Sequence, residues 1–347
     1  MSTIDYSVVR IQKLATHNVR NKEEEAGLTL SQNLSAYEPE TEKHLATYFL
    51  QPFKNLEFFK FDHSEDITMN EVYLIVQNLF ADQSEFLEDS QNIAKLLFEA
   101  SDHPKIKSGK LTVCHFTNIA LHAMNYEAIG IFKSETDTPF LKIMDDEDSY
   151  FFNHEKGFDL KGVDKACLIL NTNESEGFKI LLHDANKSGD AHFWREEFLK
   201  VTPFEDEYHH TKNVMNVTKN FVTQHLDNEI PVSKTEKIDL LNRSMDYFKK
   251  NENFERKTFE DEVLKEDEMI NSYRNYEETF FADNNLTPSD TFEINDQAVK
   301  KQSRIFKSVL KLDKNFHVYI HGKKELIEQG REDDGRKFYK IYYEIEN

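Results

Sequence analysis

Histidine, aspartate and glutamate are the residue types that could bind a metal ion here, and their spacing decides whether they do. The sequence contains 14 histidines. His209 and His210 are adjacent, and consecutive residues of a helix point about 100° apart, so their rings do not readily share one ion. His317 and His321 lie four residues apart in a strand-like segment. They are on the same face of the strand, but a distance of about two residue pairs along it separates them. No H-E-x-x-H, C-x-x-C or Cys/His zinc pattern occurs. We therefore predict no metal site and no cofactor.

Acidic residues could also serve catalysis, but their pattern does not favour it. The densest run, Asp145–Asp148, lacks the alternating D-x-D-x-D-G spacing of a calcium loop and predicts a solvated hairpin tip. Asp159, Lys161, Asp164 and Lys165 are the residue types of a nuclease site, yet such neighbours are common in a chain with 31% charged residues. A G-x-S-x-G elbow and a Gly-rich phosphate loop are both missing. We predict no catalytic residues and a non-enzymatic protein.

The charge distribution indicates a different chemistry. The formal net charge is −21, of which residues 1–299 carry −25 and residues 300–347 carry +4. An acidic body repels a phosphate backbone, whereas a basic terminal segment can contact one. The predicted DNA-binding residues are Lys300, Lys301, Arg304, Lys307, Lys311, Lys314, Lys323 and Lys324. The alternative, that these side chains simply solvate the exposed face of a terminal sheet, stays open.

The elements that position these residues predict an α+β fold. It has N-terminal helices with an antiparallel β meander, a central helical subdomain and a small C-terminal β-sheet. Apolar residues at helical spacing predict helices over 39–53, 67–80 and 88–101. Six short apolar runs with tight connections between Gly109 and Asp184 predict the antiparallel meander, because parallel strands need longer crossovers.

Changes in composition predict the domain organisation. Residues 1–204 form the α+β domain with the antiparallel sheet, and residues 205–281 form the helical subdomain. Residues 282–299 contain no Lys or Arg but several turn formers, which predicts a linker. Residues 300–347 alternate basic and apolar side chains and predict a basic, β-rich C-terminal segment.

Two sequence signals predict helix starts within the helical subdomain. Ser233 and Glu236 have the S-x-x-E form of a capping box, in which each side chain binds a backbone N–H that the helix leaves unpaired. Thr258–Asp261 has a similar form. Apolar residues follow both signals at helical spacing, so we expect a helix after each.

The cysteines and the N-terminus indicate the compartment. Cys114 and Cys167 lie in apolar, strand-like runs, which favours a reduced, buried pair over a disulfide. The first residues lack the basic and apolar regions of a secretion signal. No apolar run approaches the ~20 residues that cross a bilayer. We expect a cytoplasmic protein that does not bind membranes.

Four segments resemble the bacterial nucleoid-associated protein family typified by YejK and NdpA. The resemblance follows their order along nearly the whole chain. It implies a soluble bacterial protein found with the nucleoid, with DNA and chromosome-associated proteins such as type II topoisomerases as partners, and it does not imply an enzyme. The segments are Gly109 to Glu135, Gly157 to Asn171, Ile180 to Lys200 and Lys307 to Gly322.

Two functional hypotheses follow. In the first, the protein is nucleoid-associated and binds DNA locally through its basic C-terminal segment. In the second, it is an acidic protein-interaction module that reaches the nucleoid through a DNA-handling partner such as a type II topoisomerase. Both leave a homo-oligomer and the choice of single- or double-stranded DNA open.

Overall fold

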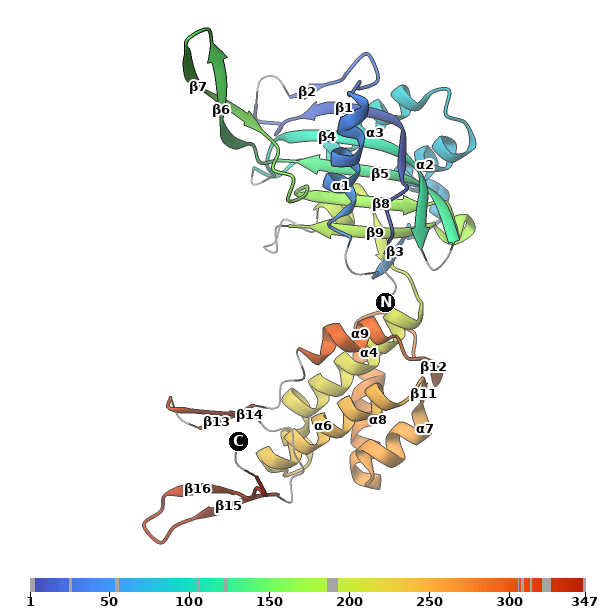
Figure 1. Cartoon of the computed structure of the whole chain (residues 1–347). Helices are drawn as coiled ribbons and strands as arrows, with labels where there is room; N and C mark the ends of the chain where they lie inside the picture. The colour runs from blue at the N-terminus through green and yellow to red at the C-terminus, as the bar shows by residue number, and fades with distance from the viewer. Residues whose placement is uncertain are drawn as a thin grey trace. The chain divides into compact units, whose positions relative to one another are not determined.

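The computed structural model describes most of the chain, and the chain divides into two compact units (Figure 1). Unit 1 comprises Met1–Phe204 and unit 2 comprises Glu205–Asn347. The residues described are 4–24, 27–53, 56–104, 106–121, 124–185, 193–304, 306, 309–312, 314–319 and 326–345.

Unit 1 is built on an eight-stranded antiparallel sheet with the strand order β10-β3-β9-β8-β5-β4-β1-β2. Its centre is the meander of neighbouring strands β4, β5, β8 and β9, as the sequence predicts. The strands are β1 (Arg10–Val19), β2 (Leu28–Thr29), β3 (Phe58–Phe61), β4 (Gly109–Leu121), β5 (Met124–Ser134), β8 (Lys165–Leu170), β9 (Lys179–Asp184) and β10 (Val201–Pro203).

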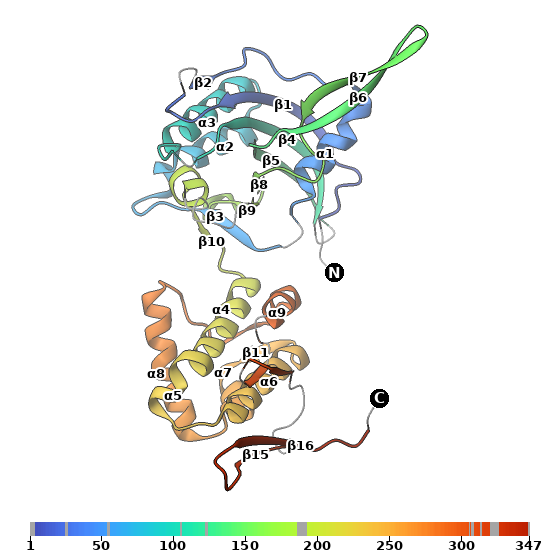
Figure 2. The same ribbon diagram turned by 90° about the vertical axis from the view of Figure 1, so that its left-hand side faces the viewer.

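Helices cover both faces of this sheet (Figure 2). The α-helices are α1 (Glu42–Leu50), α2 (Glu71–Ala81) and α3 (Phe86–Ala100). Short 3₁₀ turns span Pro39–Thr41, Ile67–Met69 and Glu174–Glu176, and a π-helix spans Phe193–Phe198. One core contains side chains from α2, α3 and the π-helix, and the other contains side chains from α1. Double coverage explains why β8 is buried along its whole length.

Cys114 and Cys167 lie on opposite faces of the sheet. Cys114 belongs to the core beneath α1, and Cys167 belongs to the core beneath α2 and α3. Both are free and buried, and burial raises the pKa of each thiol because it disfavours the thiolate. The prediction of a buried, unbridged pair is therefore confirmed.

Two of the six runs predicted for the meander lie outside it. β6 (Thr138–Asp146) and β7 (Ser149–Gly157) form a separate two-stranded hairpin. The reason is that β5 and β8, which flank this hairpin in sequence, pair directly with each other. The acidic run does occupy the hairpin tip, as predicted, with Glu147 and Asp148 in the turn.

Unit 2 begins with a group of helices around one apolar core. Helix α6 starts with the predicted capping box: the Ser233 side chain accepts from the Glu236 N–H, and the Glu236 carboxylate accepts from the Ser233 N–H at 2.7 Å. The second predicted start is wrong, because Thr258 lies inside α7 and its hydroxyl donates to Glu255. The α-helices are α4 (Glu207–Asn220), α5 (Leu226–Glu229), α6 (Lys234–Lys250), α7 (Arg256–Phe259), α8 (Asp267–Asp283) and α9 (Asp296–Ser303).

Short irregular and extended elements connect these helices. Two π-helices span Phe221–His225 and Glu260–Leu264. Strands β11 (Asn253–Glu255) and β12 (Thr291–Glu293) pair antiparallel. Thus β12 and the start of α9 lie within the segment 282–299.

Unit 2 ends in two small antiparallel hairpins. The first joins β13 (Val309–Leu312) to β14 (Phe316–Tyr319), and the second joins β15 (Ile327–Arg331) to β16 (Lys337–Ile341). Apolar side chains from both hairpins pack against Ile238 of α6. The fold is therefore α+β, with an antiparallel sheet, a central helical region and small C-terminal sheets, as predicted. The finer division of residues 205–347 stays a prediction.

Candidate nucleic-acid interface

Helix α9 carries the first predicted DNA-binding residues, and its sequence explains why it forms. The Asn295 side chain caps the helix by accepting from the N–H groups of Gln297 and Ala298, at 3.0 and 3.1 Å. Ala298 and Val299 are buried, and Val299 belongs to the helical core of unit 2. The Asn295 N–H donates to the Thr211 hydroxyl of α4 at 3.0 Å, which fixes the start of α9 against α4.

Three cations follow at the other end of α9. Lys300 and Lys301 lie in its last turn, Arg304 follows at the C-cap, and all three side chains are exposed. Cations are favoured there because the helix dipole places partial negative charge at the C-terminus. The Lys301 ammonium also lies 5.7 Å from the ring centroid of Tyr208 in α4. The structure therefore brings these three predicted residues together on one anchored helix end.

Helix α9 was not predicted from the sequence. A signal was present: Asn295 and Asp296 are a typical helix start, and Ala298, Val299 and Gln302 follow on one buried face. The turn formers before it concealed this signal and favoured a linker. The helix is important for the candidate site because it fixes the backbone positions of Lys300 and Lys301.

The first hairpin positions two further predicted residues. Lys314 is exposed in the turn between β13 and β14. Lys311 occupies a β13 register position opposite His317. The rings of Phe316 and Tyr319 in β14 are 62% and 59% exposed, which leaves them accessible to a ligand. Lys307, Lys323 and Lys324 lie outside the described residues.

The second hairpin contributes little net charge. Arg336 pairs with Asp334 at 2.6 Å, and Lys340 pairs with Glu328 at 3.6 Å. The Tyr342 hydroxyl and Lys340 both hold the pKa of the Glu328 carboxyl below its usual range. By sequence, residues 300–314 contain six basic residues and one acidic residue, whereas residues 315–347 contain six basic and seven acidic. The cationic character is therefore concentrated in residues 300–314.

The charged residues considered for nuclease chemistry form ion pairs and hydrogen bonds within unit 1. Lys165 is almost fully buried and pairs with Asp184 at 2.8 Å. The Asp164 carboxylate accepts from the N–H groups of Glu135 and Thr136, at 2.7 and 3.2 Å, which fixes the chain after β5. Asp159 pairs instead with the exposed Lys161 at 3.0 Å. These contacts explain the residues as parts of the fold.

A second buried lysine, Lys133, lies next to this group. It is the register partner of Lys165 on β5 and pairs with Glu135 at 3.1 Å. Burial lowers the pKa of Lys133 because the charged amine loses hydration. The Phe193 ring lies 5.4 Å from the Lys133 ammonium and 5.3 Å from that of Lys165. The burial of these two lysines was not predicted, since nothing in the local sequence distinguishes them from exposed lysines.

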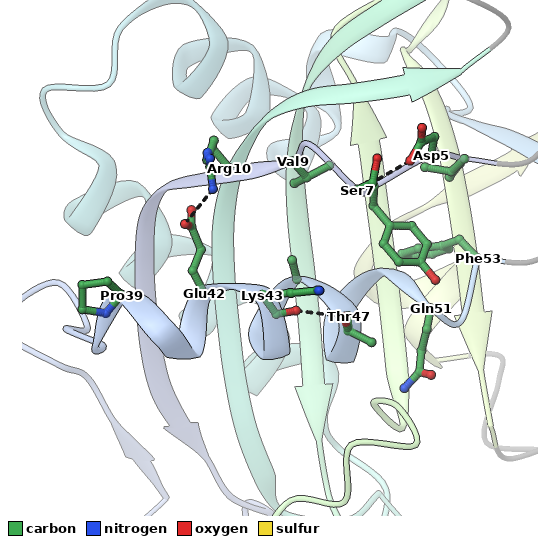
Figure 3. A pocket seen from close by; sticks show the side chains of 13 residues that line it. Asp5, Ser7, Val9, Arg10, Pro39, Glu42, Lys43, Thr47, Gln51 and Phe53 are labelled. Atoms are coloured by element: carbon green, nitrogen blue, oxygen red, sulfur yellow. Dashed lines mark hydrogen bonds and ion pairs between the residues drawn. The ribbon is translucent and has the colours of Figure 1, made fainter.

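Unit 1 also has an open pocket of about 620 Å³ between its N-terminal segment and α1 (Figure 3). Arg10 and Glu42 pair across it at 3.3 Å, and Glu42 also accepts from the Ile11 N–H at 2.9 Å. The other charged groups lining it are Asp5 and Lys43. Within the described part of the chain, no group of three or more His, Cys, Asp or Glu residues is arranged to hold a metal ion. No described helix is long and apolar enough to cross a membrane.

These features define an α+β protein with a strongly acidic composition and a local cationic surface on unit 2. Over residues 16–338 the sequence matches the family described as nucleoid-associated protein YejK. The chain belongs to this family, which confirms the resemblance seen in the sequence. No curated protein matches the chain.

Proposed function

We propose that this nucleoid-associated protein binds DNA directly, without catalysis, through the basic C-terminal segment. The observation that carries the proposal is the cluster of Lys300, Lys301 and Arg304, exposed together at the end of a helix whose other face is buried. A fixed helix end presents its charges at lower entropic cost than a loop does. The remaining contacts are assigned to Lys307, Lys311, Lys314, Lys323 and Lys324.

The negative net charge of the chain means that any contact with DNA must be local and sensitive to salt. A chain of −21 is repelled by DNA as a whole. The Debye length is about 8 Å at physiological ionic strength, so phosphates touching the cluster are screened from distant carboxylates. Residues 300–314 can therefore attract DNA despite the acidic total.

A salt titration of the full chain on a DNA duplex of about 30 base pairs tests the proposal. Each phosphate neutralised contributes about −0.9 to the slope of log affinity against log salt concentration. We expect a slope of about −3 to −6. Undetectable binding at low salt would reject direct contact.

The second candidate is protein-mediated association with the nucleoid. The large excess of acidic residues supports it, because clustered carboxylates resemble phosphates to a DNA-handling protein. Here the full chain has no DNA affinity, and pull-downs treated with nuclease still recover one specific partner. Loss of every partner on nuclease treatment would contradict it.

A further inference from the structure

The β6–β7 hairpin projects away from the main sheet of unit 1 (Figures 1 and 2). Its large apolar side chains are exposed. An isolated two-stranded hairpin is at best marginally stable in water. Contiguous exposed apolar surface usually marks an interaction site. The hairpin therefore requires an explanation that the DNA contact does not give.

The register of the hairpin divides it into two faces with different exposure. The face that we call the arm face has four apolar side chains that are 61% to 73% exposed: Leu141, Ile143, Tyr150 and Phe152. On the opposite face, Phe140, Met144 and Phe151 are only 38% to 50% exposed. Phe140 packs over Gly157 there, where a Cβ would lie 3.2 Å from the ring. The arm face is thus the more exposed of the two.

Charges at the two ends of the arm face are of opposite sign. Asp145 lies at the tip, and Lys156 lies at the base of the hairpin. Both side chains are exposed on the same face as the apolar group between them. Pro139 and His154 complete the face.

We propose that two copies of the chain stack their arm faces on each other in antiparallel orientation, about a two-fold axis. This arrangement places Lys156 of each copy beside Asp145 of the other and buries the apolar centre. A parallel stack would instead bring the two acidic tips together, which is unfavourable.

The composition of the arm face fits a second copy. Its eight side chains are all exposed, with four apolar ones in the centre and opposite charges at the two ends. A two-fold interface requires a surface that complements itself, as the arm face does. The acidic tip, in contrast, repels nucleic acid.

Sedimentation velocity of the full chain over a range of concentrations tests this proposal. Wild type forms a dimer. Phe152→Gln weakens the dimer by roughly 100-fold, because two buried rings are lost per dimer. Phe151→Gln, one residue away on the opposite face, changes the dissociation constant by less than about 3-fold. Circular dichroism confirms that both variants are folded.

Charge exchange gives a second, independent readout. Lys156→Glu weakens the dimer, and Lys156→Glu combined with Asp145→Lys restores it, since the ion pairs re-form with reversed sign. A wild type that stays monomeric at about 100 μM would overturn the proposal. So would equal effects of the Phe151 and Phe152 variants, no recovery in the double variant, or capture of DNA or another protein by the arm face of a monomer.

Discussion

His17 is held as a neutral imidazole by two hydrogen bonds in unit 1. The Ser31 N–H donates to Nδ1 at 3.1 Å, so Nε2 carries the proton and lies 3.0 Å from the Ser90 hydroxyl. Burial lowers the pKa of His17 below its ordinary value. The unfolded chain therefore binds the proton first as the pH falls. Stability from this residue is complete above about pH 6.5 and is lost below it.

His17→Gln should flatten the pH dependence of the free energy of unfolding between pH 7 and pH 5. The wild-type slope contains up to about 1.4 kcal/mol per pH unit from this one site. Urea unfolding at each pH, followed by circular dichroism, measures it. The exposed His44→Gln serves as the control for the loss of one histidine. An unchanged slope in His17→Gln would show that the residue takes up protons equally in both states.

Gly177 combines a left-handed backbone with close packing. Its φ is +100°, and a Cβ there would lie 2.3 Å from the Phe61 carbonyl oxygen. Gly335 has φ +88° but no atom within 4 Å of a Cβ. Gly177→Ala should therefore destabilise by at least about 2 kcal/mol, and Gly335→Ala by about 1 kcal/mol. Equal unfolding free energies for the two variants would mean that β3 moves to accommodate the methyl group.

At the scale of elements, the capping box of α6 offers a direct test. Ser233→Ala removes the acceptor for the Glu236 N–H and should cost about 1 kcal/mol in the stability of unit 2. Ser233→Asp keeps an acceptor and should stay within a few tenths of a kcal/mol of wild type. Denaturant unfolding of the full chain compares the two. Similar losses in both would contradict the role of the cap.

Local sequence patterns predicted the helices and strands better than they predicted which strands pair with each other. The apolar run at β8 and the cap at Ser233 are local signals, and both were confirmed. The position of β3 between β9 and β10 depends on pairing with residues more than 100 positions away, which no local pattern encodes. For the same reason the burial of Lys133 was not foreseen.

The residues of the candidate site were predicted from their charge, whereas their positions in the fold were not predicted. The sequence indicated which residues are basic, and the structure shows that Lys300, Lys301 and Arg304 share the end of α9. It also shows that Arg336 and Lys340, equally basic by sequence, are paired with carboxylates. Which basic residues gather at one helix end and which lie in a hairpin beside acidic residues depends on the fold, so sequence alone did not separate the two groups.

At the scale of the whole molecule, we propose that an acidic chain contacts DNA through one small cationic cluster. Residues 1–299 carry a net charge of −25, which keeps nonspecific contact with DNA weak. A second copy stacked on the arm face would double the number of cationic clusters per particle. Two weak contacts on one DNA molecule would then act together with a higher effective affinity.

The most direct test compares the salt dependence of DNA binding in two full-length variants, one with three substitutions and one with two. Lys300→Gln, Lys301→Gln and Arg304→Gln together should weaken binding and reduce the log–log salt slope by about 2 to 3. The control, Arg336→Gln with Lys340→Gln, removes cations that are already paired and should leave the slope within about 0.5 of wild type. An unchanged slope in the triple variant, or an equal reduction in the control, would contradict the assignment of DNA contact to the end of α9.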